Sequence, residues 1–227
     1  MQWDGFATYV FSEVGNVRAK PLQLGIDTAI QEVFARGVLP VVMLARGCEA
    51  LHASAVKVSA GIIALCGVSG TGKSTTALAL AHSGLGHYAD DTLVFRFVGD
   101  RPVVVRLPFQ ACADGLGQRA GRTPATRVGT LTEAPCEGPL YRIYHLRRDT
   151  GVDPFSPVFV PVEPADRFPL LLTHAHPFDM GTAERRRTFL TNLMTLARVV
   201  EVWECRFAPD LRALPSLAAA IRRHASE

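Results

Sequence analysis

GVSGTGKS, at residues 67–74, fits the phosphate-binding pattern G-x-x-x-x-G-K-[ST]. Glycines in this pattern allow backbone N–H groups to turn inward and surround a phosphate. Lys73 adds a positive charge for the β- and γ-phosphates, and Ser74 offers a hydroxyl to Mg²⁺. An apolar run at 62–66 precedes the loop and a helical pattern at 73–82 follows it, so the helix directs its positive end at the anion. The sequence therefore predicts a nucleotide site, with ATP and Mg²⁺ as its expected ligands.

A pair of carboxylates, Asp90 and Asp91, stands directly before a strand-like run at 92–98. Because the interval from Lys73 to Asp90 holds one helix and one turn, we expect the pair to return beside the phosphate loop. There a carboxylate can ligate Mg²⁺ or accept a proton from an attacking hydroxyl. His52 begins an alternating segment, and a hairpin of 52–58 with 62–66 would bring it to the nucleotide end. Spacing alone does not separate this role from that of a plain surface or core histidine.

The rest of the chain alternates between strand and helix patterns. Further strands are predicted at 6–11, 39–44, 141–146, 158–162 and 199–207. Further helices are predicted at 26–36, with Gly37 as its stop, at 164–173, at 183–198, and at the end of the chain after a cap at Asp210 or Ser216. Residues 108–140 lack periodicity and are predicted to form a mobile substrate loop. Its arginines, Arg119, Arg122 and Arg127, slightly favour an extended or anionic acceptor, although solvated loop arginines are equally consistent.

Composition excludes several classes of protein. The 227 residues are 48% hydrophobic and 20% charged with a net charge of +3, as in an ordinary globular protein that has no need of nucleic acid. No apolar run approaches the ~20 residues needed to span a bilayer, and the start carries no leader pattern. The five cysteines form no C-x-x-C pair, so neither a disulfide framework nor a zinc site is expected. These features predict a cytoplasmic protein without membrane or nucleic-acid partners.

From His52 to about Phe95, the chain resembles the catalytic domain of HPr kinase/phosphorylase and its shorter relatives. The resemblance rests on the segment His52-Ala53-Ser54-Ala55, on the phosphate loop, and on the Ala-Asp-Asp return after a short helix. Phosphoenolpyruvate carboxykinase shares this arrangement. The resemblance implies an α/β fold with a P-loop kinase core of this type, in which a mixed sheet is flanked by helices. It also implies one catalytic domain over 1–227, in which strands and a helix of residues 1–50 lead into the core and the N-terminal domain of the bifunctional enzymes is absent.

The resemblance implies a role for each matching position. Asp90 matches the base that acts on an acceptor serine, Asp91 matches an acidic neighbour that supports the metal, and His52 matches a histidine close to the transferred phosphoryl group. Lys73 completes the expected catalytic residues, and Ser74 and Asp91 are the expected Mg²⁺ ligands. The expected nucleotide ligands are Gly67, Val68, Ser69, Gly70, Thr71, Gly72, Lys73, Ser74 and Thr75.

Short members of this family often accompany enzymes that modify ribosomally made peptides, and some phosphorylate lasso-peptide precursors. Leu39-Pro40 and the tail at 202–211 resemble that group. The resemblance therefore implies an ATP-dependent kinase for a serine hydroxyl of a peptide or small protein, and it leaves self-association open. Two alternatives remain: a small-molecule kinase, and a regulator that binds ATP without catalysis. The presence of both carboxylates argues against the second, because binding alone does not require a group on the acceptor side.

Overall fold

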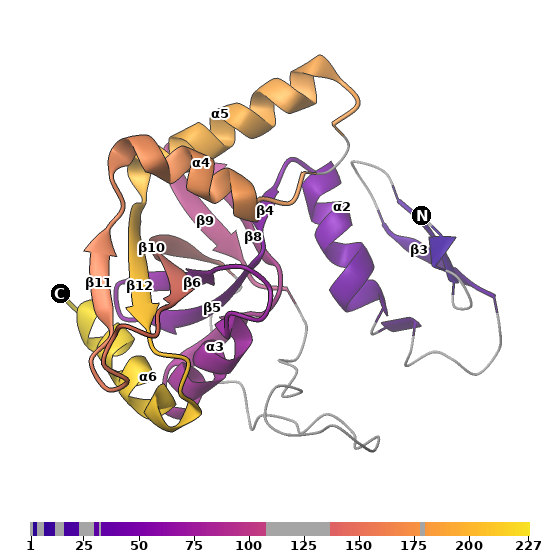
Figure 1. Ribbon diagram of the computed structural model, residues 1–227. Helices are drawn as coiled ribbons and strands as arrows, with labels where there is room; N and C mark the ends of the chain where they lie inside the picture. Colours follow the sequence, from indigo (N-terminus) through magenta and orange to yellow (C-terminus); the bar gives the residue numbers. More distant parts are fainter. Residues whose placement is uncertain are drawn as a thin grey trace.

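The computed structural model describes residues 2–3, 7–11, 16–22, 30–31, 33–107, 137–177 and 180–227. At its centre is a nine-stranded mixed sheet, whose main path runs β4-β8-β9-β10-β6-β5-β7 (Figure 1). Strands β12 and β11 extend the sheet beside β10. The bounds are β4 (Glu49–Leu51), β5 (Ala53–Val58), β6 (Gly61–Cys66), β7 (Gly86–Ala89), β8 (Leu93–Val98), β9 (Arg101–Val105), β10 (Glu137–Arg148), β11 (Val158–Pro161) and β12 (Glu201–Phe207).

Strand directions gather five segments at one edge of the sheet. Strands β6, β10 and β12 are mutually parallel, and β5 lies antiparallel between β6 and β7. The carboxyl ends of β7, β6, β10 and β12 therefore meet at the same edge as the start of β5. In open α/β sheets, ligands bind outside the carboxyl ends of the strands. This edge is where the phosphate loop leaves β6.

Strand β10 joins two parts of the sheet. Its residues 137–139 pair antiparallel with β9, whereas residues from Leu140 onward pair with β6 and then β12. The register with β6 shifts between Leu140 and Arg142. Because its ends pair with different neighbours, the sheet curls around β10.

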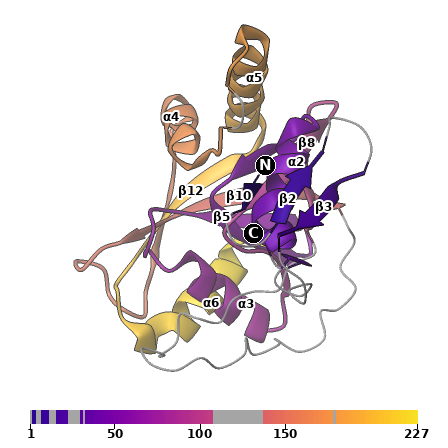
Figure 2. The same cartoon turned by 90° about the vertical axis from the view of Figure 1, so that its right-hand side faces the viewer.

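Helices cover both faces of the central strands (Figures 1 and 2). Helices α3 (Lys73–His82) and α6 (Leu214–His224) pack on the face to which β6 contributes Ile63 and Leu65. Helices α4 (Pro164–His174) and α5 (Ala183–Val199) cover the other face, to which β6 contributes Ile62, Ala64 and Cys66. This alternation along one strand makes both faces of β6 apolar, as expected for a strand covered on both sides.

The N-terminal part has its own small sheet of β1 (Gln2–Trp3), β2 (Ala7–Val10) and β3 (Arg18–Pro21). The strand predicted at 39–44 is wrong: these residues form helix α2 (Leu39–Ala45), which continues the π-helical turn η1 (Phe34–Val38) without a stop at Gly37. A short apolar run fits either a helix or a strand. Here the helix buries Val42 and Leu44, and Leu44 packs with Val94 of β8.

Most other local predictions hold. The hairpin of β5 with β6 is confirmed, α3 begins and ends where predicted, and α4 and α5 differ from their predicted bounds by one residue. Asp210 caps the short helix η2 (Leu211–Ala213), which leads into α6. Strands β4, β7 and β9 were not predicted. The predicted loop at 108–140 overlaps β10 at 137–140, and its residues 108–136, with their arginines, lie outside the described residues.

No helix in the described ranges is long and apolar enough to cross a membrane. Three cysteines within those ranges, Cys48, Cys66 and Cys205, are buried free thiols.

Candidate functional site

The phosphate loop takes backbone conformations that glycine favours. Gly67, Gly70 and Gly72 have φ angles of 153°, 79° and 109°, all in the positive region that other residues rarely adopt. At Gly67, a Cβ atom would also lie 3.0 Å from the carbonyl oxygen of Leu146 on the neighbouring strand β10. The loop ends at Gly72, and the N-terminus of α3 with its unpaired N–H groups follows directly. These features suit the binding of an anion at the edge of the sheet.

Lys73 is held inside this loop. Its side chain is buried, and its ammonium group donates to the carbonyl oxygens of Gly67 and Val68 at 2.9 and 3.3 Å. Burial lowers the pKa of Lys73, and the nearby Asp90 and Asp91 offset part of that shift. A phosphate bound in the loop would favour the charged form further, because opposite charges within a few ångströms stabilise each other.

Asp90 lies on the sheet side of the site, where β7 ends. A carboxylate oxygen of Asp90, Oδ1, accepts a hydrogen bond of 2.9 Å from the Ser54 hydroxyl. That hydroxyl lies 3.5 Å from the hydroxyl of Ser74 on α3. Ser54 is fully buried, so this contact joins β5, the turn after β7 and the first turn of α3. The prediction that the acid pair returns beside the phosphate loop is confirmed, because Asp90 is connected to Ser74 through Ser54 and Asp91 lines the same cavity as the loop.

Asp91 lies next to His52 and is exposed to the cavity and to solvent. Its side chain is 79% exposed, and its Oδ1 lies 3.3 Å from His52 Nδ1. The same ring nitrogen lies 3.0 Å from the backbone carbonyl oxygen of Asp91. Among the described residues, Asp91 is the one non-glycine residue with a positive φ, at 65°. Aspartate tolerates this conformation better than most residues, and such backbone strain often occurs at functional sites.

A segment at the end of α4 supports His52. The backbone N–H of His52 donates to the carbonyl oxygen of His174 at 2.6 Å, and that of His176 donates to Ala50 at 2.9 Å. The rings of His52 and His176 meet edge-on, with their centroids 5.6 Å apart. Burial lowers the pKa of His176, and it lowers the pKa of His174 to about 4. Sequence reasoning missed this support, because β4 and its pairing with residue 175 are long-range features.

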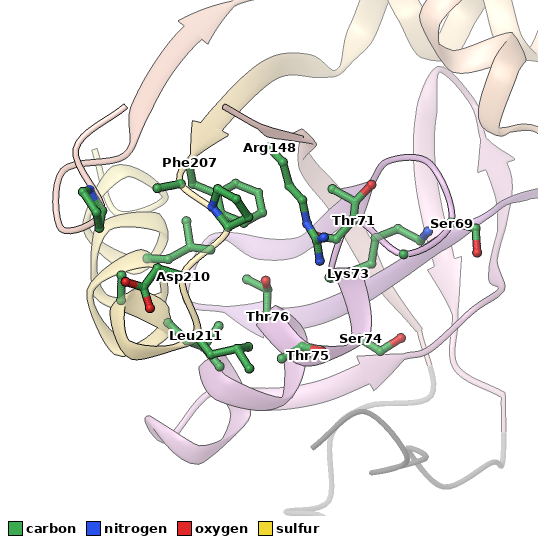
Figure 3. Close-up of a pocket in the computed structure, with 18 of the residues that line it drawn as sticks. Ser69, Thr71, Lys73, Ser74, Thr75, Thr76, Arg148, Phe207, Asp210 and Leu211 are labelled. Carbon is green, nitrogen blue, oxygen red and sulfur yellow. The ribbon is translucent and has the colours of Figure 1, made fainter. Parts of the chain in front are cut away.

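One cavity of about 600 Å³ runs along the loop. His52 and Asp91 line it, as do seven of the nine expected nucleotide ligands, namely Ser69, Gly70, Thr71, Gly72, Lys73, Ser74 and Thr75. The other two, Gly67 and Val68, hold Lys73 through their carbonyl groups. Figure 3 shows Thr71 and Lys73 on one side of the cavity, Phe207 and Leu211 on the other, and Arg148 between them.

Sequence reasoning also missed this second wall of the cavity. Arg148 ends β10 and donates from Nε to the carbonyl oxygen of Thr71 at 3.1 Å. Phe207 ends β12, and Leu211, Leu214 and Leu217 follow it. These residues lie at or after the ends of two apolar strands, β10 and β12, and this position is the sequence signal that could have identified them. The order of the two strands in the sheet, however, cannot be derived from the spacing of residues in the sequence.

The donors beside the loop suit a magnesium ion. Asp90 and Ser74 offer oxygen atoms, and Mg²⁺ is usually bound through one or two carboxylates together with substrate phosphates. Within the described residues there is no group of three or more His, Cys, Asp or Glu side chains that could hold a metal by itself. A site completed by phosphates fits these residues better than a cage made of protein alone.

Comparison with known proteins finds similarity among solved structures. No protein-family model matches the chain, and no curated protein matches it. Among solved structures, it is similar to the Hpr(Ser) kinase/phosphatase from Coxiella burnetii, with 15% identity and a TM-score of 0.44, over 77% of this chain and 89% of that chain. The expected architecture, a mixed sheet with flanking helices, is the one observed. The chemistry of this chain follows from its own residues.

Proposed function

We propose that this protein is an ATP-dependent kinase that transfers a phosphoryl group to a serine hydroxyl of a peptide or small protein. The observation that carries the proposal is the gathering of an anion-binding loop, two carboxylates and a histidine at one edge of the sheet. His52 and Asp91 line the same cavity as the loop residues 69–75. An acceptor hydroxyl in this cavity can therefore meet both a carboxylate and the phosphate loop.

The contacts of the two carboxylates favour a division of roles that differs from the sequence prediction. Asp90 shares the Ser54 hydroxyl with Ser74, which is the residue expected to ligate Mg²⁺. Asp91 is exposed to the cavity beside His52. We therefore infer that Asp90 supports the metal with Ser74, and that Asp91 acts as the base on the acceptor. The predicted order, with Asp90 as base and Asp91 at the metal, is the alternative that substitution distinguishes.

The transfer would rest on positioning and on neutralising charge. Loop N–H groups and Lys73 would hold the phosphates, and bound Mg²⁺ would supply further positive charge there. Asp91 would accept the proton of the serine hydroxyl while the oxygen of that hydroxyl forms a bond to the γ-phosphorus. At the same time, the bond between the γ-phosphorus and the β–γ bridging oxygen would break, and ADP would leave. His52, in contact with Asp91, would orient that carboxylate.

The choice of a peptide acceptor rests on the sequence resemblance to kinases of lasso-peptide precursors. The open setting of Asp91 supports an acceptor that arrives from solvent. The free thiols are compatible with a cytoplasmic reaction. A regulator that only binds ATP would not need an exposed carboxylate beside the end of the phosphate site, and this observation favours the kinase.

Substitution of the loop lysine tests the proposal. In Lys73→Ala, the phosphate loop loses its lysine side chain, so we expect ATP-dependent formation of phosphoserine on a serine-containing peptide library to fall about a hundredfold or more. Mass spectrometry of the peptides measures the product, and circular dichroism checks the fold. Lys57→Ala, on β5 and outside the cavity, is the matched control and should keep wild-type activity. Equal activity of the Lys73 variant would refute the nucleotide site, and ATP hydrolysis without any phosphopeptide would refute the acceptor class.

A further inference from the structure

We propose that the end of the cavity beyond Arg148, lined by Phe207, Leu211, Leu214 and Leu217, binds the nucleoside part of the nucleotide. The base would then lie against α6, and the terminal phosphate would lie at His52 and Asp91. This inference rests on the proposed function, because it concerns the same nucleotide. It assigns a ligand to these four apolar residues, which binding of the phosphates in the loop would not explain.

The first support is continuity. The loop residues, Asp91 and the apolar residues from Phe207 to Leu217 line one cavity of about 600 Å³, within the usual size range for a small-molecule site. On one side of the loop, His52 directly precedes β5 and Asp91 follows the end of β7. On the other side of the loop, β10 and β12 end. A nucleotide whose phosphates occupy the loop must therefore extend from it toward one of these two ends.

The second support is the difference in chemistry between the two ends. At one end stand the ionisable side chains of His52 and Asp91, which suit a reacting phosphate. At the other end, aromatic and aliphatic side chains offer the apolar lining typical of pockets for planar ligands. Leu211 is 68% exposed, so part of this surface is open to a ligand. Contact of a base with apolar surface removes that surface from water and lowers the free energy of binding, whereas contact of a charged phosphate with it does not.

Arg148 stands where the two ends meet. Its Nε donates to the carbonyl oxygen of Thr71, which fixes the guanidinium group against the phosphate loop. Figure 3 shows this side chain between Thr71 and Phe207. A guanidinium group is a preferred partner for phosphate oxygens. Its position fits the phosphate nearest the ribose, between the loop and the apolar end.

Helix α6, whose Leu214 and Leu217 line the cavity, packs on the sheet through the buried Leu217 and is fixed to it at its last turn. The Tyr144 hydroxyl lies 2.8 Å from His224 Nδ1, and Arg142 donates to the backbone carbonyl oxygen of His224 at 2.6 Å. The His224 ring also stacks on Phe159 with centroids 4.3 Å apart. These contacts anchor the last turn of α6 to β10 and β11. A rigid wall binds a base without first having to be ordered.

The test compares ATP with inorganic tripolyphosphate, which lacks the nucleoside. Wild-type protein should bind ATP more tightly than tripolyphosphate, as measured by isothermal titration calorimetry with Mg²⁺. Leu211→Ser should weaken ATP binding about five- to twentyfold and leave tripolyphosphate binding unchanged, because only the nucleoside reaches this residue. Leu190→Ser, on α5 and outside the cavity, is the matched control and should change neither affinity.

Photolabelling with 8-azido-ATP gives an independent readout, because the reactive group is on the base. We expect the label within residues 207–217. If Leu211→Ser leaves ATP affinity unchanged and the label lies in another segment, the nucleoside assignment is wrong. Binding of tripolyphosphate that depends on Lys73 would in that case still support the phosphate site. If neither ATP nor tripolyphosphate binds, both the nucleoside assignment and the proposed kinase function are overturned.

Discussion

The two neighbouring carboxylates of the site differ in what they touch. Asp90 accepts from the buried Ser54 hydroxyl beside Ser74, whereas Asp91 projects into the cavity next to His52. If Asp91 is the general base, as we propose, Asp91→Asn should lower the rate of phosphoryl transfer about 10²–10⁴-fold with ATP affinity changed only a few-fold. Asp90→Asn should instead raise the Mg²⁺ concentration needed for half-maximal rate. Steady-state kinetics over a Mg²⁺ titration measure both effects.

Each of these variants serves as the control for the other, because the side chains are adjacent and the substitution is the same. A loss of rate confined to Asp90→Asn, together with a higher Mg²⁺ requirement in Asp91→Asn, would restore the order predicted from the sequence. Equal behaviour of the two variants would show that the carboxylates act as one unit.

Helix α5 is held to the sheet by a buried ion pair. Glu49 on β4 is 1% exposed, and its two oxygens accept from Arg185 at 2.6 and 2.8 Å. Asn192 also donates to Glu49, at 2.9 Å. In Arg185→Met, the buried carboxylate loses its cation, so we expect the free energy of unfolding to fall by about 3–5 kcal/mol. Urea unfolding monitored by circular dichroism measures the change.

The double variant Glu49→Leu/Arg185→Met is the control for this prediction. It removes the charge together with its partner, and such apolar replacements of buried ion pairs are often neutral or stabilising. We expect it to recover most of the lost stability. A single variant that unfolds at the wild-type urea concentration would show that the pair does not hold α5.

The whole molecule should lose stability in mild acid, because several histidines are neutral in the fold. Burial, together with the nearby His145, Lys73 and His52, lowers the pKa of His174 to about 4. In the unfolded chain this ring titrates near its ordinary pKa of about 6.5. Between these values the unfolded state binds more protons, so the free energy of unfolding falls as pH decreases from about 6.5 to 4. His174 alone accounts for about 3 kcal/mol of this loss.

The measurement is urea unfolding at pH 7 and at pH 4.5, for the wild type and for His174→Phe. The variant fills a similar volume but cannot bind a proton, so its stability should depend less steeply on pH. Burial also lowers the pKa values of His87, His145, His176 and His224, and these groups should leave a residual dependence of the same sign in the variant. Identical pH dependence in both proteins would refute the assignment to His174.

Features that depend on neighbouring residues could be read from the sequence. The phosphate loop is one of them, because its glycines are needed for positive φ angles within the loop itself. The β5–β6 hairpin and helices α3, α4 and α5 are others, because each shows its own periodicity. The short path from Lys73 to Asp90 also restricts where the acid pair can lie. Where the local pattern fits two structures, as in α2, sequence reasoning failed.

The tertiary structure decided what depends on strand order and on burial from distant segments. Arg148 and Phe207 reach the cavity only because β10 and β12 lie parallel beside β6, and no local pattern specifies that order. The different surroundings of Asp90 and Asp91 likewise depend on Ser54 and His52. Ser54 lies on the antiparallel strand β5, and His52 directly precedes that strand. The sequence by itself therefore determined where the expected phosphate site lies, directly after β6. Long-range packing of both faces of the sheet determined which side chains line the rest of the cavity.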